Sequence, residues 1–181
     1  MTSDPASSDP AASDRVVGPA PPSGNETGVA RVTAMLERDV ASAALGIEVL
    51  ELDVGRARMR MRVRPDMVQG YGTLQGGLLF ALADTAFAAA CNGRGTGPTV
   101  AASAEITWVA PAFAGDVLVA DAVEHTRYGR NGITDVRVTR EADDALLALF
   151  RGRSVELSRA PSPAASPPSR ACAPTGDAGA P

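Results

Sequence analysis

One charged side chain, Asp84, interrupts an otherwise uncharged stretch between Asp66 and Arg94. It lies within the run Gly76-Gly-Leu-Leu-Phe-Ala-Leu-Ala-Asp-Thr-Ala-Phe-Ala-Ala-Ala-Cys-Asn-Gly93. A carboxylate that leaves water without partners costs several kcal/mol or takes up a proton, so chains seldom keep one in an apolar helix without a use. Asp84 is therefore a candidate for a functional-site residue. In the alternative, structural interpretation, Asp84 caps or bridges buried backbone groups.

The glycine-rich segment Gly70-Tyr-Gly-Thr-Leu-Gln-Gly-Gly77 precedes this acid and allows three interpretations. As a dinucleotide fingerprint its glycine spacing is one residue too long, and no parallel βαβ unit follows it. Alternatively, Gly76 and Gly77 open a helix whose unpaired N–H groups and positive dipole end hold a carbonyl oxygen as it becomes an oxyanion. The third interpretation is a flexible turn that is required only for close packing.

Asp84 follows Gly77 by seven residues, which places both on one face of a helix. At 1.5 Å of rise per residue they are about 10 Å apart, too far for one small reacting group to touch both. Either a second chain supplies half of the site, or the acid serves elsewhere. A twofold dimer would combine the N-terminal amides of one subunit with the acid of the other.

The remaining reactive side chains indicate no other chemistry. Cys91 lies in an apolar run, which favours a small core residue, and the only histidine, His125, lies on an expected strand with no sign of pairing. The sequence contains no Gly-x-Ser-x-Gly elbow, and one histidine with a distant cysteine cannot make a zinc site. We therefore expect neither a metal nor a cofactor.

The composition is that of a globular protein. With 45% hydrophobic and 21% charged residues, the 181-residue chain can bury one ordinary core. A net charge of -4 without basic blocks argues against nucleic acid as a partner. Two cysteines make no disulfide framework, which fits a reducing, cytoplasmic location. The central Asp84 also argues against membrane insertion of the most apolar stretch.

The ends of the chain differ in composition from its middle. Residues 1–28 are rich in Pro, Ala and Ser and lack an apolar signal region, so they are expected to be a disordered N-terminal lead. Residues 159–181 have a similar composition and are expected to be a disordered tail. The predicted domain is 29–158.

Apolar periodicity within this domain predicts its elements. A helix is expected over 29–45, with Gly46 as its stop, and the central helix begins near Gly76. Gly55 should link the first two strands as a hairpin, and Asn131-Gly132 is a strong signal for a second hairpin. The expected strands are 47–54, 56–63, 99–109, 116–127, 132–140 and 145–157.

These short links imply an antiparallel sheet, because parallel neighbours need a crossover of about a dozen residues. The long helix is apolar almost all the way round and must be covered on several sides. The sequence therefore predicts an α+β fold in which a curved antiparallel sheet wraps around one long central helix.

Three segments together carry a family resemblance: Gly70 to Asn92, Pro111-Ala-Phe-Ala-Gly-Asp116 and Ala148-Leu-Phe-Arg-Gly-Arg-Ser154. They resemble the hotdog-fold acyl-CoA thioesterases of the phenylacetate-degradation (PaaI) type, over most of residues 30–157. The resemblance implies a hotdog homodimer, usually paired again into a homotetramer. It also implies hydrolysis of aryl- or acyl-CoA thioesters without a metal.

Site roles follow from this resemblance residue by residue. Asp84 would be the nucleophile or the general base, Gly76 the oxyanion donor, and Gln69 the residue that orients the attacking water. Gln75, Gly77 and Thr85 would contact the substrate. The family's His-Gly-Gly is Gln75-Gly76-Gly77 in this chain, and Leu74 replaces a common Cys. Gln75 can hydrogen-bond but carries no charge near neutral pH.

For the CoA tail, the resemblance indicates the loop Tyr128-Gly-Arg-Asn-Gly132. Arg130 would pair with phosphate, and Asn131 lies beside it. The alternative is an ordinary hairpin with solvated charges. The acyl pocket walls are expected among Leu78, Phe80, Phe87 and Trp108.

Three functions remain open from the sequence. The first is a thioesterase that releases CoA and a carboxylic acid, with phenylacetyl- or hydroxyphenylacetyl-CoA as the expected class of substrate. The second is a hotdog dehydratase or hydratase, which Gln75 in place of histidine disfavours. The third is a non-catalytic protein that binds acyl-CoA.

Overall fold

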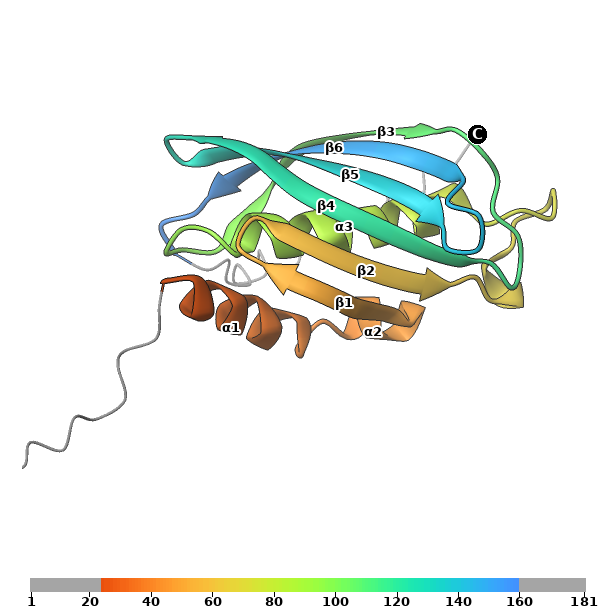
Figure 1. Ribbon diagram of the computed structural model, residues 1–181, viewed down its shortest axis with the longest axis horizontal. Coiled ribbons are helices and arrows are strands. Elements are labelled where there is room, and N and C mark those ends of the chain that lie inside the picture. Colours follow the sequence, from red (N-terminus) through yellow and green to blue (C-terminus); the bar gives the residue numbers. More distant parts are fainter. Residues whose placement is uncertain (1–23, 160–181) are drawn as a thin grey trace, which may run out of the picture.

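A curved six-stranded antiparallel sheet surrounds one long helix in the computed structural model, which describes residues 24–159 (Figure 1). The predicted disordered lead and tail lie outside this range, apart from 24–28 and Arg159. The elements are α1 (Gly24–Leu36), α2 (Val40–Leu45), β1 (Ile47–Asp53), β2 (Arg56–Arg62), the 3₁₀ helix η1 (Pro65–Met67), α3 (Gly76–Asn92), β3 (Thr99–Trp108), β4 (Val117–Tyr128), β5 (Asn131–Arg140) and β6 (Leu146–Glu156).

The strands follow the order β1-β2-β4-β5-β6-β3, and each pairs antiparallel with its neighbours. On β2, Met59 and Met61 are fully buried while Arg58 and Arg62 are exposed, which is the period of two typical of a sheet with one covered face. Gly55 (φ +76°) joins β1 to β2 as expected. The predicted α+β hotdog fold is confirmed.

The single helix expected over 29–45 is two helices in the structure. α1 begins at Gly24, five residues before the expected start of the domain. α2 begins after Asp39, whose carboxylate accepts hydrogen bonds from N and Oγ of Ser42 at 3.0 and 2.6 Å. An aspartate that caps a new helix competes with continuation of the preceding one, and apolar periodicity does not reveal this. The predicted stop at Gly46 is confirmed by its φ of +71°.

The hairpin between β4 and β5 is confirmed, but its turn lies two residues before the predicted one. Gly129, with φ +57°, and Arg130 form the turn, whereas Asn131 and Gly132 belong to β5. Gly132 is required for space, because a Cβ at this position would lie 2.6 Å from Glu124 Oε1. The Asn-Gly pair therefore serves packing inside the sheet.

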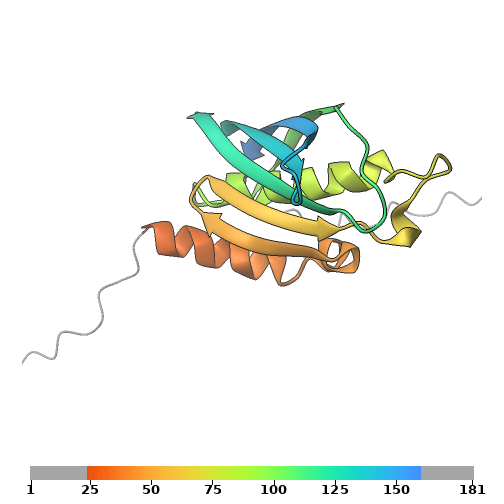
Figure 2. The ribbon, with the colours of Figure 1, turned by 45° about the vertical axis from the view of Figure 1, so that its right-hand side comes forward.

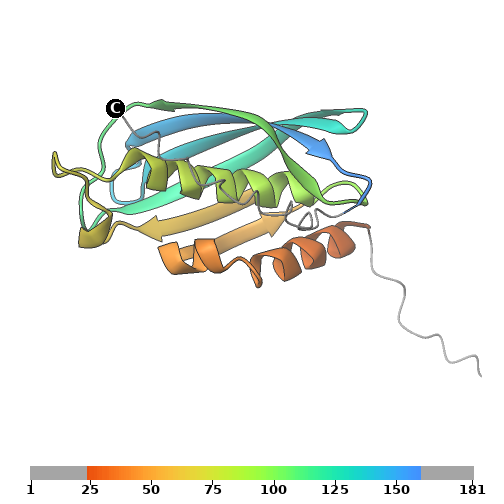
Figure 3. The same ribbon diagram turned by 180° about the vertical axis from the view of Figure 1, so that it is seen from behind.

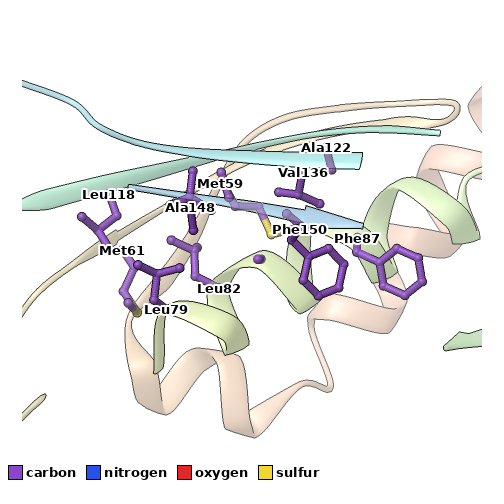
Figure 4. Packing of buried hydrophobic residues seen from close by; sticks show 14 of the residues in the cluster. Met59, Met61, Leu79, Leu82, Phe87, Leu118, Ala122, Val136, Ala148 and Phe150 are labelled. Atoms are coloured by element: carbon purple, nitrogen blue, oxygen red, sulfur yellow. The ribbon is translucent and has the colours of Figure 1, made fainter. Parts of the chain in front are cut away.

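α3 lies in the curve of the sheet and packs one side against the strands (Figures 1 and 2). Leu82 and Phe87 are buried on this side, and the ring centroids of Phe87 and Phe150 are 5.7 Å apart (Figure 4). The fully apolar packing surface explains why this segment is hydrophobic over so many residues. Within residues 24–159, no helix combines the length and the hydrophobicity that a membrane crossing needs.

The opposite side of α3 faces away from the sheet, and α1 runs beside part of it (Figure 3). This outer side carries Ala81, Asp84 and Ala88, all half-buried, and the exposed Gly77 at its start. Their spacing of three or four residues puts them in one row along the helix. We call these four residues the outer row of α3.

The connection from α3 to β3 is held by buried hydrogen bonds. The Asn92 side chain accepts from Thr99 N and donates to Thr99 O, both at 2.8 Å. Arg127 on β4 donates to the Cys91 carbonyl oxygen at 3.0 Å. These bonds fix the edge strand β3 beside α3, so that Trp108, the last residue of β3, reaches the helix N-terminus.

Candidate active site

The side chain of Gln75 caps the N-terminus of α3. Its Oε1 accepts hydrogen bonds from the N–H groups of Gly77 and Leu78, the second at 3.2 Å. Two of the amides that a helix cannot satisfy internally are therefore paired. A neutral glutamine is sufficient for this contact, but it provides no titratable group at this position.

The N–H of Gly76, at the first position of α3, remains available. No described residue accepts a hydrogen bond from it. The indole Nε1 of Trp108 donates to the Gly76 carbonyl oxygen at 3.3 Å, and a Cβ on residue 76 would lie 3.1 Å from that nitrogen. The Gly76 N–H is thus a free hydrogen-bond donor at the positive end of the helix dipole. The absence of a side chain at this residue makes room for the Trp108 indole.

Gly76 also lines a cavity of about 370 Å³. This volume lies within the range of about 300–1,000 Å³ that is usual for small-molecule pockets. None of the residues that line it is ionisable. They are Thr73, Leu74, Gly76, Leu79, Trp108, Val109, Ala110, Pro111 and Ala112.

Asp84 is half-buried in the outer row of α3, and no described residue stabilises its charge. Desolvation raises the pKa of the Asp84 carboxyl above its ordinary value, with no hydrogen bond or counter-ion to lower it. The interpretation in which Asp84 caps or bridges buried backbone groups therefore finds no partner within residues 24–159. A carboxylate with a raised pKa is a stronger base than an exposed one.

We expect the Asp84→Asn variant to be more stable than the wild type at pH 7. Because burial raises the folded-state pKa of Asp84 above its unfolded value, the charged carboxylate opposes folding at neutral pH. This cost disappears below the unfolded-state pKa of ~3.9. Urea unfolding should therefore give the variant the larger free energy of unfolding at pH 7 and nearly equal values near pH ~3.5.

Asp135→Asn is the matched control for this stability measurement. A hydrogen bond from the Arg151 side chain lowers the pKa of Asp135, so the charged form of this acid favours folding. Asp135→Asn should therefore lose stability at pH 7. A loss of stability in Asp84→Asn as well would contradict the description of Asp84 as an unpaired charge.

Gln69 closes the loop that precedes α3. Its Nε2 donates to Thr73 Oγ1, and its Oε1 accepts from Tyr71 N, both at 2.8 Å. A primary amide has a second N–H and a second acceptor lone pair. The water-orienting role expected for Gln69 thus depends on this remaining N–H donor and this remaining acceptor lone pair, and it stays a prediction.

Thr85 lies next to Asp84 but turns toward α2. Its hydroxyl donates to the Ala81 carbonyl oxygen at 2.9 Å and lies 3.0 Å from Ser42 Oγ. These contacts join α3 to α2 within one chain. The expected contact of Thr85 with substrate stays a prediction.

Arg130 and Asn131 lie far from the N-terminus of α3 within one chain. Arg130 Nε donates to the Glu156 carbonyl oxygen at 2.8 Å, and Asn131 pairs with Tyr128 at the hairpin end. The neighbouring Arg127 contacts the last turn of α3, so this hairpin lies at the helix end opposite to Gly76. A single chain does not bring the predicted phosphate-binding residues to the predicted oxyanion donor.

Gly76 and Asp84 are also separated within one chain. They are eight residues apart on α3, which corresponds to about 12 Å along the helix axis. One chain therefore groups Gln75, Gly76 and Gly77 at the helix start and leaves Asp84 two turns away. The sequence predicted a similar separation, about 10 Å, between Gly77 and Asp84.

Cys91 and His125 contribute no second reactive centre. Cys91 is buried in the core, where desolvation raises the pKa of its thiol to about 12. His125 is exposed on β4, and its Nε2 lies 3.3 Å from an Asp135 carboxylate oxygen. Within residues 24–159, no three His, Cys, Asp or Glu side chains are grouped to hold a metal ion.

Two aromatic residues, Phe87 and Trp108, were both expected to line the acyl pocket, and the structure places them differently. Phe87 was an expected pocket wall, but it is only 1% exposed and packs on Phe150 in the core. Trp108, by contrast, contacts Gly76 and is 55% exposed. The end of β3 meets the start of α3 only in the folded sheet, so the sequence offered no signal for this contact beyond an aromatic residue on a strand.

Comparison with known proteins identifies relatives. Residues 71–146 match the family model described as the thioesterase superfamily. The chain is 40% identical over 121 residues to the acyl-coenzyme A thioesterase PaaI of Escherichia coli, covering 67% of this chain and 85% of that protein.

Solved structures agree with this result. The E. coli PaaI protein from the phenylacetic acid degradation operon superposes with a TM-score of 0.70 at 36% identity, covering 74% of this chain and 96% of that one. A point mutant of the phenylacetic acid degradation protein PaaI from Thermus thermophilus gives 0.62 at 41% identity, covering 66% of this chain and 100% of that one.

Proposed function

The chain belongs to the thioesterase superfamily and is an acyl-CoA thioesterase, and we propose that it acts on aryl-acetyl thioesters such as phenylacetyl- or hydroxyphenylacetyl-CoA. One observation carries the proposed hydrolytic mechanism: the unpaired carboxylate of Asp84 lies on the same helix as the free N–H of Gly76. The relatives named for phenylacetic acid degradation support this class of acyl group.

In the proposed reaction, ionised Asp84 accepts a proton from water as the water oxygen attacks the thioester carbonyl carbon. The carbonyl oxygen becomes an oxyanion, which the Gly76 N–H and the helix dipole stabilise. Collapse of this intermediate breaks the carbon–sulfur bond, and the proton held by Asp84 passes to the CoA thiolate. The products are the free acid and CoA-SH.

We propose that a homodimer completes the site, with Gly76 of one subunit facing Asp84 of the other. β3 is an edge strand, so one side of its backbone is unpaired among the residues that the structure describes, and α3 lies beside it (Figure 3). A twofold axis perpendicular to β3 at this edge makes the two α3 helices antiparallel and moves the start of one toward the middle of the other. The small side chains of the outer row, Gly77, Ala81 and Ala88, let a second chain approach Asp84 closely.

The same dimer would bring the β4–β5 hairpin of one subunit toward the Gly76 end of the other. Arg130 uses Nε on the Glu156 carbonyl oxygen, which leaves its two terminal nitrogens for a CoA phosphate. Pairing of dimers into a homotetramer and a cytoplasmic location stay predictions from the sequence.

A non-catalytic acyl-CoA-binding protein is the second candidate. It is favoured by Gln75, which occupies the position of a family histidine and whose Oε1 is engaged by two helix amides. Under this second hypothesis the chain binds acyl-CoA without turnover.

The test is release of CoA-SH from phenylacetyl-, hydroxyphenylacetyl-, benzoyl- and short alkyl-CoA thioesters. We expect the aryl-acetyl thioesters to have the highest kcat/KM, with one free acid formed per CoA-SH. Tight binding of all these thioesters with only background release would favour the binding protein. Consumption of an enoyl-CoA with formation of its hydroxyacyl-CoA would instead favour a hydratase.

A further inference from the structure

Trp108 is the only tryptophan of the chain, and it contacts Gly76 at the start of α3. Its indole packs against Gly76 on the side where a Cβ would project, with Nε1 bonded to the Gly76 carbonyl oxygen. It also forms part of the wall of the 370 Å³ cavity. Trp108 therefore touches both the oxyanion-donating residue and the space beside it.

The rest of the cavity wall is uncharged. Leu74, Leu79 and Ala112 form its buried part, and each is less than 10% exposed. The hydroxyl of Thr73 accepts a hydrogen bond from Gln69 and keeps its own O–H as a neutral donor. An acyl group with a carboxylate of its own would lose water in this cavity without gaining a positively charged partner, which is costly.

We propose that Trp108 is a specificity-determining residue whose indole forms the aromatic wall of a neutral acyl pocket beside the Gly76 amide. This inference rests on the proposed thioesterase function. A flat aryl group can stack on, or pack edge-to-face against, the indole while its thioester carbonyl meets the Gly76 N–H. The pocket selects uncharged aryl acyl groups over dicarboxylic ones such as succinyl.

The exposure of Trp108 agrees with such a binding surface. Trp108 is 55% exposed, and its one hydrogen bond goes to a backbone carbonyl, so the described residues leave more than half of its surface uncovered. A large aromatic group left exposed beside a cavity is typical of a ligand-binding surface. The neighbouring Val109, 52% exposed, extends this apolar surface.

Kinetics of Trp108→Ala and Trp108→Phe test the proposal. Trp108→Ala should lower kcat/KM for phenylacetyl-CoA about tenfold or more, and for acetyl-CoA less than about threefold, because only the larger group contacts the indole. Trp108→Phe keeps an aromatic wall and should stay within about threefold of the wild type for both thioesters. Leu149→Ala, an exposed apolar truncation on the outer face of β6, is the control and should leave both values unchanged. An equal loss for both thioesters in Trp108→Ala would overturn the inference but not the thioesterase.

Fluorescence supplies a readout that does not depend on turnover, since Trp108 is the sole tryptophan. In the Asp84→Asn variant, saturating phenylacetyl-CoA should shift the emission to shorter wavelength, whereas CoA-SH alone should not. Saturation is established independently by calorimetry. If calorimetry shows that phenylacetyl-CoA binds but the tryptophan emission is the same as with CoA-SH, the proposed role of Trp108 is overturned. Absence of binding would overturn the proposed aryl-acetyl substrate class, and the inference about Trp108 with it.

Discussion

Replacing Asp84 with asparagine is expected to lower kcat for thioester hydrolysis by about 10²- to 10⁴-fold, the usual contribution of a positioned general base. Asparagine keeps the size of the side chain but cannot take a proton from water. The variant leaves Gly76 and the cavity beside Trp108 unaltered, so the affinity for acyl-CoA should change little. CoA-SH release measures kcat, and calorimetry measures affinity.

Two further measurements make this result specific. Asp135→Asn removes a surface carboxylate that is paired with Arg151 on the other face of the sheet, and it should leave kcat unchanged. In the wild type, kcat/KM should fall as the pH drops through the pKa of Asp84, which lies above that of an ordinary aspartate because the carboxyl is desolvated. Turnover by Asp84→Asn within about threefold of the wild type would exclude Asp84 as the base.

The sequence predicted the fold where a local pattern and tertiary packing require the same thing. On β2, alternation of arginine with Met59 and Met61 gave both the strand and its buried face. The run from Gly76 gave α3, and its lack of a polar face gave the wrapped arrangement. Gly46 and Gly55 marked turns because their positive φ angles suit glycine better than other residues.

The predictions from the sequence were wrong at positions where one residue type can have several structural roles. Asp39 lies within a helical pattern and acts as a cap, a role that depends on Ser42 being at hydrogen-bonding distance. Asn131-Gly132 suggested a turn, but Gly132 is small because Glu124 and Ser154 lie beside it in the folded sheet. The place of Gly132 in the sheet depends on contacts with residues that are distant in sequence. Apolar periodicity reveals neither such contacts nor the capping role of Asp39.

The candidate site divides in the same way. Asp84 and Gly76 could be found from the sequence because an isolated acid and a glycine pair are local anomalies. The contact of Trp108 with Gly76 could not, since it depends on β3 crossing to the far edge of the sheet and ending beside α3. The engagement of Gln69 by its own loop likewise needed coordinates.

Replacing Gly76 with proline is expected to lower kcat by about 10²- to 10³-fold, the usual cost of losing one oxyanion donor. Proline deletes the N–H and is otherwise well accepted at the first position of a helix. The backbone of Gln75 is already extended (φ −64°, ψ 124°), as a residue before proline must be. The fold should therefore tolerate the change.

Gly76→Ala is the matched control, because it adds a Cβ near Trp108 and keeps the N–H. The loss of activity in Gly76→Ala measures the effect of a Cβ that crowds the Trp108 indole while the N–H is kept. The ratio of kcat between the alanine and proline variants then reports the replacement of the N–H by the proline ring. Equal activity of the two variants would show that the Gly76 N–H does not hold the oxyanion.

Co-expression of the Gly76→Pro and Asp84→Asn chains tests whether two subunits share one site. If Gly76 of one subunit acts with Asp84 of the other, each mixed dimer contains one site built from two intact halves. Random pairing then restores about one quarter of the wild-type activity, although each variant alone is nearly inactive. If both residues act within one chain, every site carries one defect and the mixture stays inactive. Recovered activity would thus locate the proposed reaction between α3 helices of different subunits, the arrangement that their separation of about 12 Å requires.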